Sequence, residues 1–454
     1  MKNQSEPVEL ERKLGLFSLT NIVIANMIGT GIFTTSGLLL RDLQNPLLML
    51  LLWLIGGLIA LCGALSYGEL GASFPHAGGE YIFLSRLFHP LAGFLSGWVS
   101  FFVGFSAPIA ASAIGFSEYL ARTLPALNQP VHLGFVFSSA LTKKFIAMAI
   151  ILLFTFIHLK GISLGARVQN VLTLGKVGLI VFLIALGLAS SKGSWKHLTV
   201  GDNAGFSFAS LKIIGLSLMW IMFAYSGWNA SAYIGSEIKK PEKSLPFSLL
   251  LGTGTVIILY LGLNLFYLYS LPPEEMKGVI SVGGLAAGRL LGLAWEKFVS
   301  LLIAFALFSS LSAFIILGPR VYYAMARDGL FFSFAARINP QTKVPSLSIL
   351  LQALIAIIIA LSGTFEHILT YMGFSLGLFP LLAVLGVFKL RKKNLSKLKL
   401  PGFPLTQIIY LTAGISILIL GFLRSPEPSA IAILTVLSGI PAYYLFKKKL
   451  ARPS

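Results

Sequence analysis

Two short segments of this 454-residue chain place glycine beside a hydroxyl residue inside long apolar runs. The first reads Gly29-Thr30-Gly31 and the second reads Ser226-Gly227. Glycine lacks a Cβ atom and costs about 1 kcal/mol in a helix interior, so both segments favour local unwinding. Unwinding frees amides at the start of the following half-helix and carbonyls at the end of the preceding one.

The freed backbone groups are suited to the two charges of one small zwitterion. The amides lie at a helix N-terminus, where the macrodipole is worth roughly half a positive charge and favours a carboxylate. The carbonyls would accept hydrogen bonds from an ammonium group. Phe223 precedes the second segment and could close over a ligand or pack within the bundle. A close helix contact through Gly-x-Gly is the structural alternative for either segment alone.

Lys176 is the third residue that could do chemistry. It lies in an apolar run, about 13 Å beyond Arg167 at 1.5 Å per residue, which is too deep for easy snorkelling. A lysine at the centre of a membrane helix costs about 2.5 to 3.5 kcal/mol on insertion scales. We therefore predict that Lys176 faces a polar cavity or partner inside the membrane.

Membrane-spanning helices must position these residues, because 56% of the chain is hydrophobic and only 11% is charged. An average soluble domain carries about 25% charged residues. Several apolar runs approach the ~20 residues that span ~30 Å of hydrocarbon. We predict an all-α polytopic membrane protein whose twelve transmembrane helices lie at 16–38, 46–74, 89–121, 143–159, 164–190, 208–237, 246–271, 286–326, 345–363, 366–388, 406–423 and 428–446.

The net charge of +19 is distributed over short loops between the apolar runs, and this argues against a nucleic-acid partner. Lys and Arg are more frequent on the side that would hold both chain ends, with clusters at 239–243, 389–399 and 447–452. The positive-inside rule then places both termini in the cytoplasm. We predict a multi-pass protein of the plasma membrane (the inner membrane of a bacterial cell), embedded in the lipid bilayer and without a removable signal peptide.

The span pattern repeats when the chain is shifted by about 197 residues, since spans one to five then fall on spans six to ten. Five is an odd number, so the two copies enter the membrane from opposite sides. We predict a cytoplasmic segment (1–15), a first inverted repeat (16–190), an extracytoplasmic loop (191–207), a second inverted repeat (208–388), a basic cytoplasmic loop (389–405), two further helices (406–446) and a basic tail (447–454).

The remaining reactive residue types give little chemistry. Cys62 is the only cysteine, so an intramolecular disulfide and a cysteine metal site are excluded, and we expect it to be a small buried hydrophobe. The six histidines are scattered without metal-ligand spacing, so we predict no metal and no cofactor. Glu69 and Glu237 lie near helix ends, where we consider helix-end or gating roles.

Longer motifs occur in a fixed order along residues 11–390. They are Gly29-Thr30-Gly31-Ile32-Phe33, the stretch from Tyr67 to Tyr81, the stretch from Phe223 to Asn229 with Glu237 and Pro241, and the stretch from Gly318 to Gly329. Together they resemble the amino acid, polyamine and organocation superfamily, within it the L-type and cationic amino acid transporter branches and their bacterial relatives. The resemblance implies a five-plus-five inverted-repeat bundle, like that of the sodium-coupled leucine transporter, followed by two C-terminal helices.

The resemblance also implies the function and the site. The expected function is secondary active amino acid transport by alternating access, with substrate held at the breaks in spans one and six. Main-chain groups at 30–32 would hold the carboxylate, and carbonyls around 27–28 and 223–226 would hold the amine. The substrate-binding residues so implied are Met27, Ile28, Thr30, Gly31, Ile32, Phe223, Ala224 and Ser226.

Two further roles follow from the same resemblance. Phe223 matches the aromatic gate of the family, and Lys176 resembles the lysine that occupies a sodium position in sodium-independent members. We therefore expect a proton symporter or an exchanger, with a proton as the candidate coupling ion. At Ser226 the chain departs from the L-type pattern, which often has glycine there. No disulfide-linked heavy chain is expected, because Cys62 lies within span two.

Several alternatives stay open at this point. Neutral amino acids are the favoured substrates because no acidic residue lies beside the two breaks. A carrier of polyamines or cationic amino acids would have the same site, and so would an amino acid sensor that does not transport. Residues 373–377 fit the G-x-S-x-G pattern of hydrolases. That pattern needs a strand-to-helix turn, whereas here it lies in an apolar span, so we predict that the protein is not an enzyme.

Overall fold

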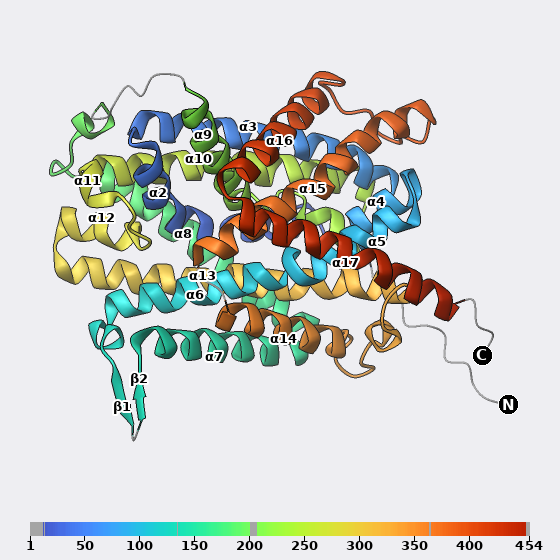
Figure 1. The fold of residues 1–454 in the computed structure, drawn as a ribbon, viewed down its shortest axis with the longest axis horizontal. Helices are drawn as coiled ribbons and strands as arrows, with labels where there is room; N and C mark the ends of the chain where they lie inside the picture. The colour runs from blue at the N-terminus through green and yellow to red at the C-terminus, as the bar shows by residue number, and fades with distance from the viewer. Residues whose placement is uncertain (1–11, 13, 134, 200–206, 363–364, 451–454) are drawn as a thin grey trace.

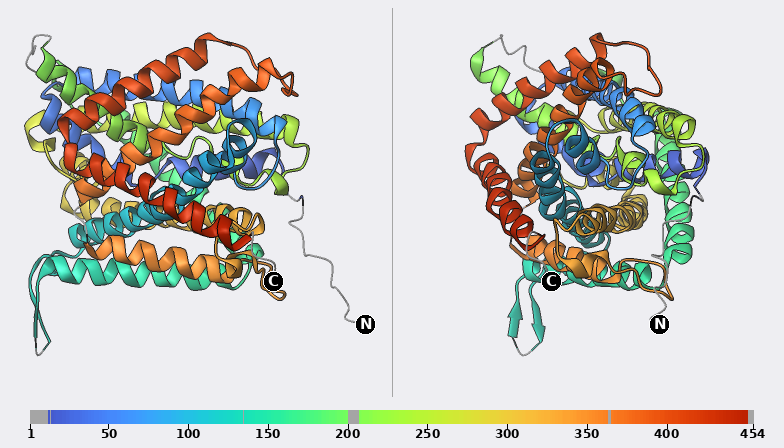
Figure 2. Two further views of the ribbon diagram at one scale, coloured as in Figure 1. Left: turned by 45° about the vertical axis from the view of Figure 1, so that its right-hand side comes forward. Right: turned by 90° about the vertical axis from the view of Figure 1, so that its right-hand side faces the viewer.

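The computed structural model describes residues 12, 14–133, 135–199, 207–362 and 365–450. Most of the chain is helical, and the long helices run roughly parallel to the long axis of the molecule (Figure 1). Seen along that axis, the helices form a closely packed bundle (Figure 2).

The longer α-helices follow one another along the whole chain. In chain order they are α1 (Leu16–Met27), α2 (Thr30–Leu43), α3 (Pro46–Ser73), α4 (Glu80–Leu87), α5 (Pro90–Val99), α6 (Ser106–Thr123), α7 (Ser139–Leu159), α8 (Ile162–Ala189), α9 (Phe208–Ala224), α10 (Pro241–Ser270), α11 (Pro273–Met276), α12 (Val282–Leu291), α13 (Leu293–Arg327), α14 (Ser346–Ser362), α15 (Phe365–Lys392), α16 (Leu405–Arg424) and α17 (Pro426–Leu450).

Shorter elements connect them. They are the π-helical segment η1 (Ser100–Gly104), the 3-10 turns η2 (Pro125–Asn128), η3 (Trp195–Leu198), η4 (Ala230–Tyr233), η5 (Gly235–Glu237) and η6 (Ser333–Ala336), and the strands β1 (Val131–Leu133) and β2 (Phe135–Phe137).

Within the described residues, ten segments are long and apolar enough to cross a membrane. They are Leu16–Leu43, Pro46–Ser73, Pro90–Thr123, Ser139–Leu159, Val168–Ala189, Pro241–Ser270, Leu293–Arg327, His367–Lys392, Leu405–Arg424 and Pro426–Lys448. Three shorter apolar helices accompany them: Phe208–Ala224, Val282–Leu291 and Ser346–Ser362. The fold is thus that of a largely helical, polytopic membrane protein.

Side-chain caps and proline explain where several helices begin. The Asn45 side chain accepts a hydrogen bond from the Leu48 amide (2.9 Å), and Pro46 occupies the first helical position of α3, where its missing N–H costs nothing. Ser138 caps α7 in the same way through the amide of Leu141. These starts lie close to the predicted boundaries at 46 and 143.

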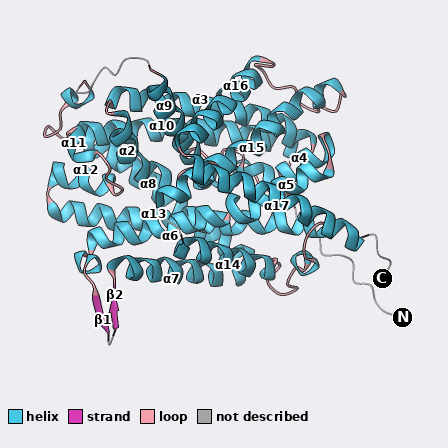
Figure 3. Ribbon diagram, in the orientation of Figure 1, coloured by secondary structure: helices cyan, strands magenta, loops and turns pink. Residues whose placement is uncertain are grey.

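Three features differ from the sequence prediction. The predicted span 286–326 is two helices, α12 and α13, which meet at Gly292 with φ +98°. An antiparallel two-stranded hairpin, β1 with β2, projects from one end of the bundle, where no strand was predicted (Figure 3). Cys62 is half-buried on α3, so our expectation of a buried cysteine was wrong.

The core lies around the third and seventh of these ten apolar segments. In Pro90–Thr123 and Leu293–Arg327, 83% and 78% of the most apolar window is buried, against 22% in α7, α16 and α17. The inner helix α13 packs against α1 and α2, and α6 also contacts α2. α9 packs instead against α2, α3, α15 and α16, and the outer helices present apolar side chains outward.

Candidate substrate site at two helix breaks

The first helix is broken where the glycines predict it. α1 ends at Met27, Ile28 and Gly29 leave helical geometry (Gly29 φ −111°, ψ −154°), and α2 begins at Thr30. The first-turn amides of α2 have no partner within the helix. The predicted interruption is confirmed, and it gives Thr30 the position of a first-turn residue at a helix N-terminus.

Gly31 serves a different purpose from Gly29. A Cβ atom on Gly31 would lie 2.4 Å from the Cβ of Ala224, so α2 approaches α9 more closely than any other residue type would allow. Real Cβ contacts are not that short, and a core cannot absorb such an overlap without shifting. Both explanations of the Gly-x-Gly segment therefore hold: Gly29 lies in the break and Gly31 in the helix contact.

The second break follows Ala224, the last residue of α9. Gly227 has φ +98°, and the chain continues through the short turns η4 and η5. The predicted break at Ser226-Gly227 is therefore confirmed, whereas the expectation that helix continues beyond it to residue 237 was wrong, because the positive φ of Gly227 turns the chain out of the helix. A Cβ atom on Gly227 would lie 2.7 Å from the Cβ of Asn26, so the two breaks pack directly against each other.

Tyr260 of α10 connects the two breaks. Its hydroxyl oxygen lies 2.5 Å from the Met27 carbonyl oxygen and 2.9 Å from the Ala224 carbonyl oxygen. Tyr260 is fully buried, and it was not predicted as a site residue. A tyrosine in an apolar span gives no local sequence signal, because its role depends on two helix ends that are distant in the chain.

Lys176 of α8 binds the carbonyls at the C-terminal end of α1. It is 1% exposed, and its ammonium donates to the carbonyls of Ala25 (3.1 Å) and Ile28 and to the hydroxyl of Ser310 (3.2 Å). Ser310 in turn donates to the Ile28 carbonyl (2.7 Å). The prediction that Lys176 faces polar partners is confirmed.

These contacts change what the first break can offer a ligand. A carbonyl oxygen has two lone pairs. The Met27 carbonyl accepts from Tyr260 and from the Gly29 amide (2.8 Å), and the Ile28 carbonyl accepts from Lys176 and Ser310. Both carbonyls are therefore satisfied by the protein in this conformation.

A small cavity lies at the breaks. Six of the eight predicted substrate contacts line it: Met27, Thr30, Gly31, Phe223, Ala224 and Ser226. Ile28 and Ile32 are fully buried. A larger cavity adjoins it, and the two share Asn26, Phe223, Ser226 and Phe314. Phe223 thus lies where the two spaces meet.

Asn26 is the second residue that the prediction missed. It lies in the last turn of α1, is 2% exposed and lines both cavities. Its amide nitrogen donates to the Ile22 carbonyl (2.9 Å), whereas its Oδ1 atom is buried without a hydrogen-bond partner among the described residues. A buried acceptor of this kind is costly unless a ligand or water occupies it.

Glu80 marks the far end of the larger cavity. Its carboxylate accepts hydrogen bonds from Tyr67 (2.7 Å), Asn229 (2.9 Å), Tyr233 (3.1 Å) and Ser96 (3.3 Å). Glu80 begins α4, outside the candidate spans, and burial raises its pKa while the hydrogen bonds oppose that shift. The residue belongs to a recognised motif, but its position at this cavity was not predicted.

Comparison with known proteins agrees with this geometry. The amino acid permease family profile matches residues 14–440. The chain belongs to this family. It is 28% identical to the large neutral amino acids transporter small subunit 2 of Mus musculus (96% of this chain, 81% of that protein). It is also 29% identical to the serine/threonine exchanger SteT of Bacillus subtilis (97% and 98%) and 27% identical to the Asc-type amino acid transporter 1 of Mus musculus (97% and 82%).

These relatives are amino acid transporters and exchangers, which supports amino acid transport by this permease. The family and the apolar helices together support a multi-pass membrane protein. The expectation that the chain works without a disulfide-linked heavy chain stays a prediction.

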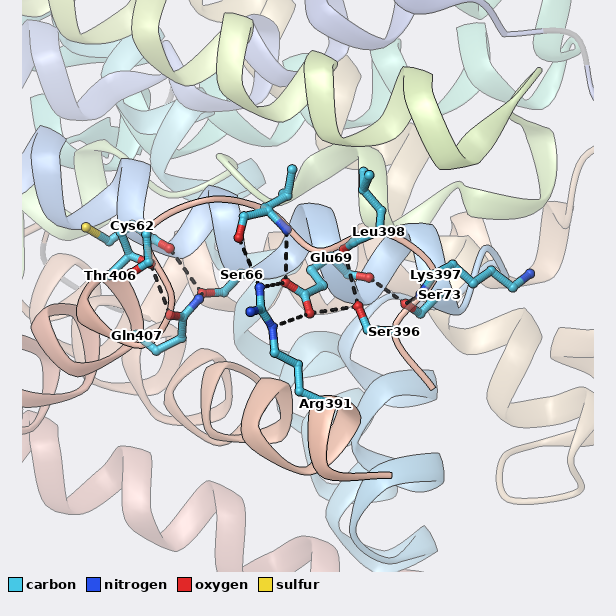
Figure 4. Close-up of polar contacts among 12 residues, drawn as sticks. Cys62, Ser66, Glu69, Ser73, Arg391, Ser396, Lys397, Leu398, Thr406 and Gln407 are labelled. Carbon is cyan, nitrogen blue, oxygen red and sulfur yellow. Dashed lines mark hydrogen bonds and ion pairs between the residues drawn. The ribbon is translucent and has the colours of Figure 1, made fainter. Parts of the chain in front are cut away.

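Two acidic residues considered for gating form buried ion pairs in the permease. Glu69 is 1% exposed, and its carboxylate accepts two hydrogen bonds from the Arg391 guanidinium (2.6 and 2.8 Å). It also accepts hydrogen bonds from the Ser396 hydroxyl (2.8 Å) and the Leu400 amide (3.3 Å), so it holds the 393–404 connection against α3 (Figure 4). Glu237 pairs with Arg320 of α13 (3.3 Å). Their role in gating stays a prediction.

The hydrolase-like pattern at 373–377 lies within the uninterrupted helix α15. Ser375 is therefore not on a strand-to-helix turn, and it lines the wall of the larger cavity instead. The non-enzyme prediction agrees with a family of transporters.

Proposed function

We propose that this permease is a sodium-independent secondary active transporter of neutral amino acids that works by alternating access, as an exchanger or a proton symporter. The observation that carries the proposal is the direct contact between two helix breaks around one small cavity. Counting α9 and α14 with the ten longer segments gives twelve spans. Residues 16–190 and 208–388 are then the proposed inverted repeats, and an even number of spans leaves both termini on one side. The excess of Lys and Arg on that side supports the proposal that it is the cytoplasmic side of the plasma membrane.

The substrate carboxylate is proposed to bind the first-turn amides of α2 at Thr30, Gly31 and Ile32. These amides have no intrahelical partners and lie at the positive end of the helix dipole. The substrate ammonium is proposed to bind the carbonyls at 223–226 together with the Oδ1 atom of Asn26, which is the unpartnered acceptor at the same cavity. The Met27 and Ile28 carbonyls would join only if Tyr260 or Lys176 moved.

Phe223 is proposed to be the gate, because it borders both cavities and separates the small one from the larger one. Lys176 is proposed to be the coupling residue. Its ammonium occupies a cage of two carbonyls and the Ser310 hydroxyl, an arrangement that suits a monovalent cation. A positive charge already built into that position removes the need for sodium.

Neutral substrates are favoured over polyamines and cationic amino acids. The small cavity is lined by apolar, hydroxyl and amide side chains, with no charged residue among those described. Glu80 does line the larger cavity, but four protein donors already surround its carboxylate. Agmatine and arginine are therefore expected to compete poorly with alanine or leucine for binding.

Uptake into proteoliposomes tests the proposal most simply. A panel of labelled neutral, cationic and acidic amino acids is offered with and without internal substrate, with and without a pH gradient, and with sodium replaced by choline. We expect sodium-independent uptake of neutral amino acids that is stimulated by internal substrate or by an acidic exterior. Binding without any flux would instead identify a transport-negative sensor.

A further inference from the structure

A third cavity lies along α1 on the N-terminal side of the substrate site, with Ser18 and Ile22 of that helix in its wall. It is bounded by α1, α7, α8, α13 and α14, and none of its lining residues lines either substrate cavity. Its half-buried rim includes Leu14 and Ser18, at the start of α1. In the proposed orientation this rim faces the cytoplasm.

The wall of this cavity is largely apolar, but several polar side chains face it. Gln169 is 2% exposed, and its Oε1 atom has no hydrogen-bond partner among the described residues. The charged or titratable groups on the wall are His158 of α7, which bonds to Ser312 (2.9 Å), and the buried pair of Glu237 with Arg320. A roomy space with several polar partners holds water, whereas truly empty cavities are apolar.

A line of polar side chains leads from the cavity toward Lys176. The Gln169 amide nitrogen donates to the hydroxyls of Thr173 (3.0 Å) and Ser309 (3.3 Å), and these hydroxyls lie 3.1 Å apart. The next residue of α13, Ser310, bonds to the Lys176 ammonium. Residues 169, 173 and 176 are spaced to lie on one face of α8.

We propose that this third cavity is a cytoplasmic water route to Lys176, separate from the substrate path, and that Gln169 positions water at its inner end. The ligand class is water and the hydrated proton. In the exchange step the Lys176 ammonium gives its proton to a water oxygen, which leaves a neutral amine and a hydronium ion, and the reverse step restores the charge. This inference rests on the proposed orientation and on the proposed coupling role of Lys176.

The single native cysteine makes a direct accessibility test possible. In a Cys62→Ser background, Gln169→Cys and Ile316→Cys probe the third cavity and Ser226→Cys probes the substrate cavity. Leu174→Cys is the control, because Leu174 is on the same helix and 58% exposed toward the outside of the bundle. A charged, membrane-impermeant methanethiosulfonate is applied to the cytoplasmic face of inside-out vesicles.

We expect both third-cavity cysteines to react while Leu174→Cys does not, and saturating neutral amino acid to protect only Ser226→Cys. Failure of both Gln169→Cys and Ile316→Cys to react would overturn the water route, and reaction only with an apolar maleimide would identify a lipid pocket. Protection by substrate would assign the cavity to the substrate path. None of these outcomes depends on whether Lys176 couples transport to protons.

The role of Gln169 is tested separately by Gln169→Leu. Gln352→Leu is the matched control, since Gln352 is also buried with an unpartnered Oε1 atom but lies outside this cavity. We expect Gln169→Leu to slow pH-dependent uptake and proton influx by about tenfold, because an ordered water would be lost and not replaced. The equilibrium binding of substrate should stay unchanged. Wild-type rates and an unshifted pH profile in Gln169→Leu would overturn this role.

Discussion

The two helix breaks have similar sequences but different surroundings. The break at 28–29 is enclosed by side chains from three other helices, namely Lys176 of α8, Tyr260 of α10 and Ser310 of α13. The break after Ala224 shares only the Tyr260 hydroxyl, at the Ala224 carbonyl, and its turn comes from its own backbone through the positive φ of Gly227. It continues toward the Glu80 cluster at the far end of the larger cavity.

This difference assigns different tasks to the two breaks. The first has its carbonyls satisfied by fixed protein donors, so it is a preorganised anchor whose free groups are the amides of α2. The second keeps carbonyls near the cavity and is joined by Asn229 to Glu80, so a change there would be transmitted to the larger cavity. Repeated sequence patterns thus specify two breaks, and the neighbouring helices make them unequal.

Removal of the lysine should disrupt the anchor most strongly. Lys176→Ala deletes the donor to two buried carbonyls, and hydrogen bonds to a charged group contribute about 1.5 to 3 kcal/mol. We expect uptake into proteoliposomes to fall by about a hundredfold or to lose its pH response. The control is Lys143→Ala, which removes a partly exposed pair with Glu118 and should change little. Unchanged, pH-responsive uptake in Lys176→Ala would remove Lys176 from the mechanism.

The break after Ala224 should be disrupted by replacement of its glycine, Gly227. Gly227→Ala forces a Cβ atom against Asn26 at a residue with φ +98°, and we expect a loss of about 1 to 3 kcal/mol in stability together with weakened substrate binding. Gly178→Ala is the control, because its Cβ would meet no atom within 4 Å. Thermal unfolding and equilibrium binding measure the two effects. Equal behaviour of the two variants would contradict a tight contact between the breaks.

Removal of the Tyr260 hydroxyl, which links the two breaks, should have a smaller effect. Tyr260→Phe removes one hydroxyl that contacts both the Met27 and the Ala224 carbonyls, and a neutral hydrogen bond contributes about 0.5 to 1.5 kcal/mol net. We expect substrate affinity to fall by about twofold to tenfold, with little change for the exposed Tyr444→Phe. Tighter binding in Tyr260→Phe would show that the hydroxyl competes with the substrate ammonium.

Replacement of Glu80 should show the smallest and most specific effect. Burial raises the pKa of Glu80, so the folded protein holds that proton more tightly than the unfolded chain does. The corresponding stability is present below the ordinary value of 4.5 and is lost as pH rises through the raised pKa. Between wild type and Glu80→Gln, the difference in thermal stability should therefore grow as pH rises through that window. A difference independent of pH would contradict a raised pKa.

Much of the fold could be predicted from the sequence because apolar runs, proline and glycine act locally. The break at 28–29 was predicted from its glycines, and the start of α3 agrees with Asn45 and Pro46. The second break was predicted from Ser226-Gly227, but the loss of helix between this break and residue 237 was missed, because hydropathy continues past the positive φ of Gly227.

The missed site residues depend on contacts that are distant in sequence. Tyr260 is one of several aromatic residues in an apolar span, and only the approach of Met27 to Ala224 makes its hydroxyl important. Asn26 gave a weak signal, as a polar residue just before a predicted break. Glu80 belongs to a recognised motif, but its place at the larger cavity follows from the folding of α4 against η4 and α5.

A structure determined with a bound neutral amino acid tests the central claim most directly. We predict density for the ligand at the small cavity, its carboxylate within hydrogen-bond distance of the amides at 30–32 and its ammonium beside Asn26 and the 223–226 carbonyls. A ligand bound elsewhere, or first and sixth spans that run through the bilayer as continuous helices, would contradict the account.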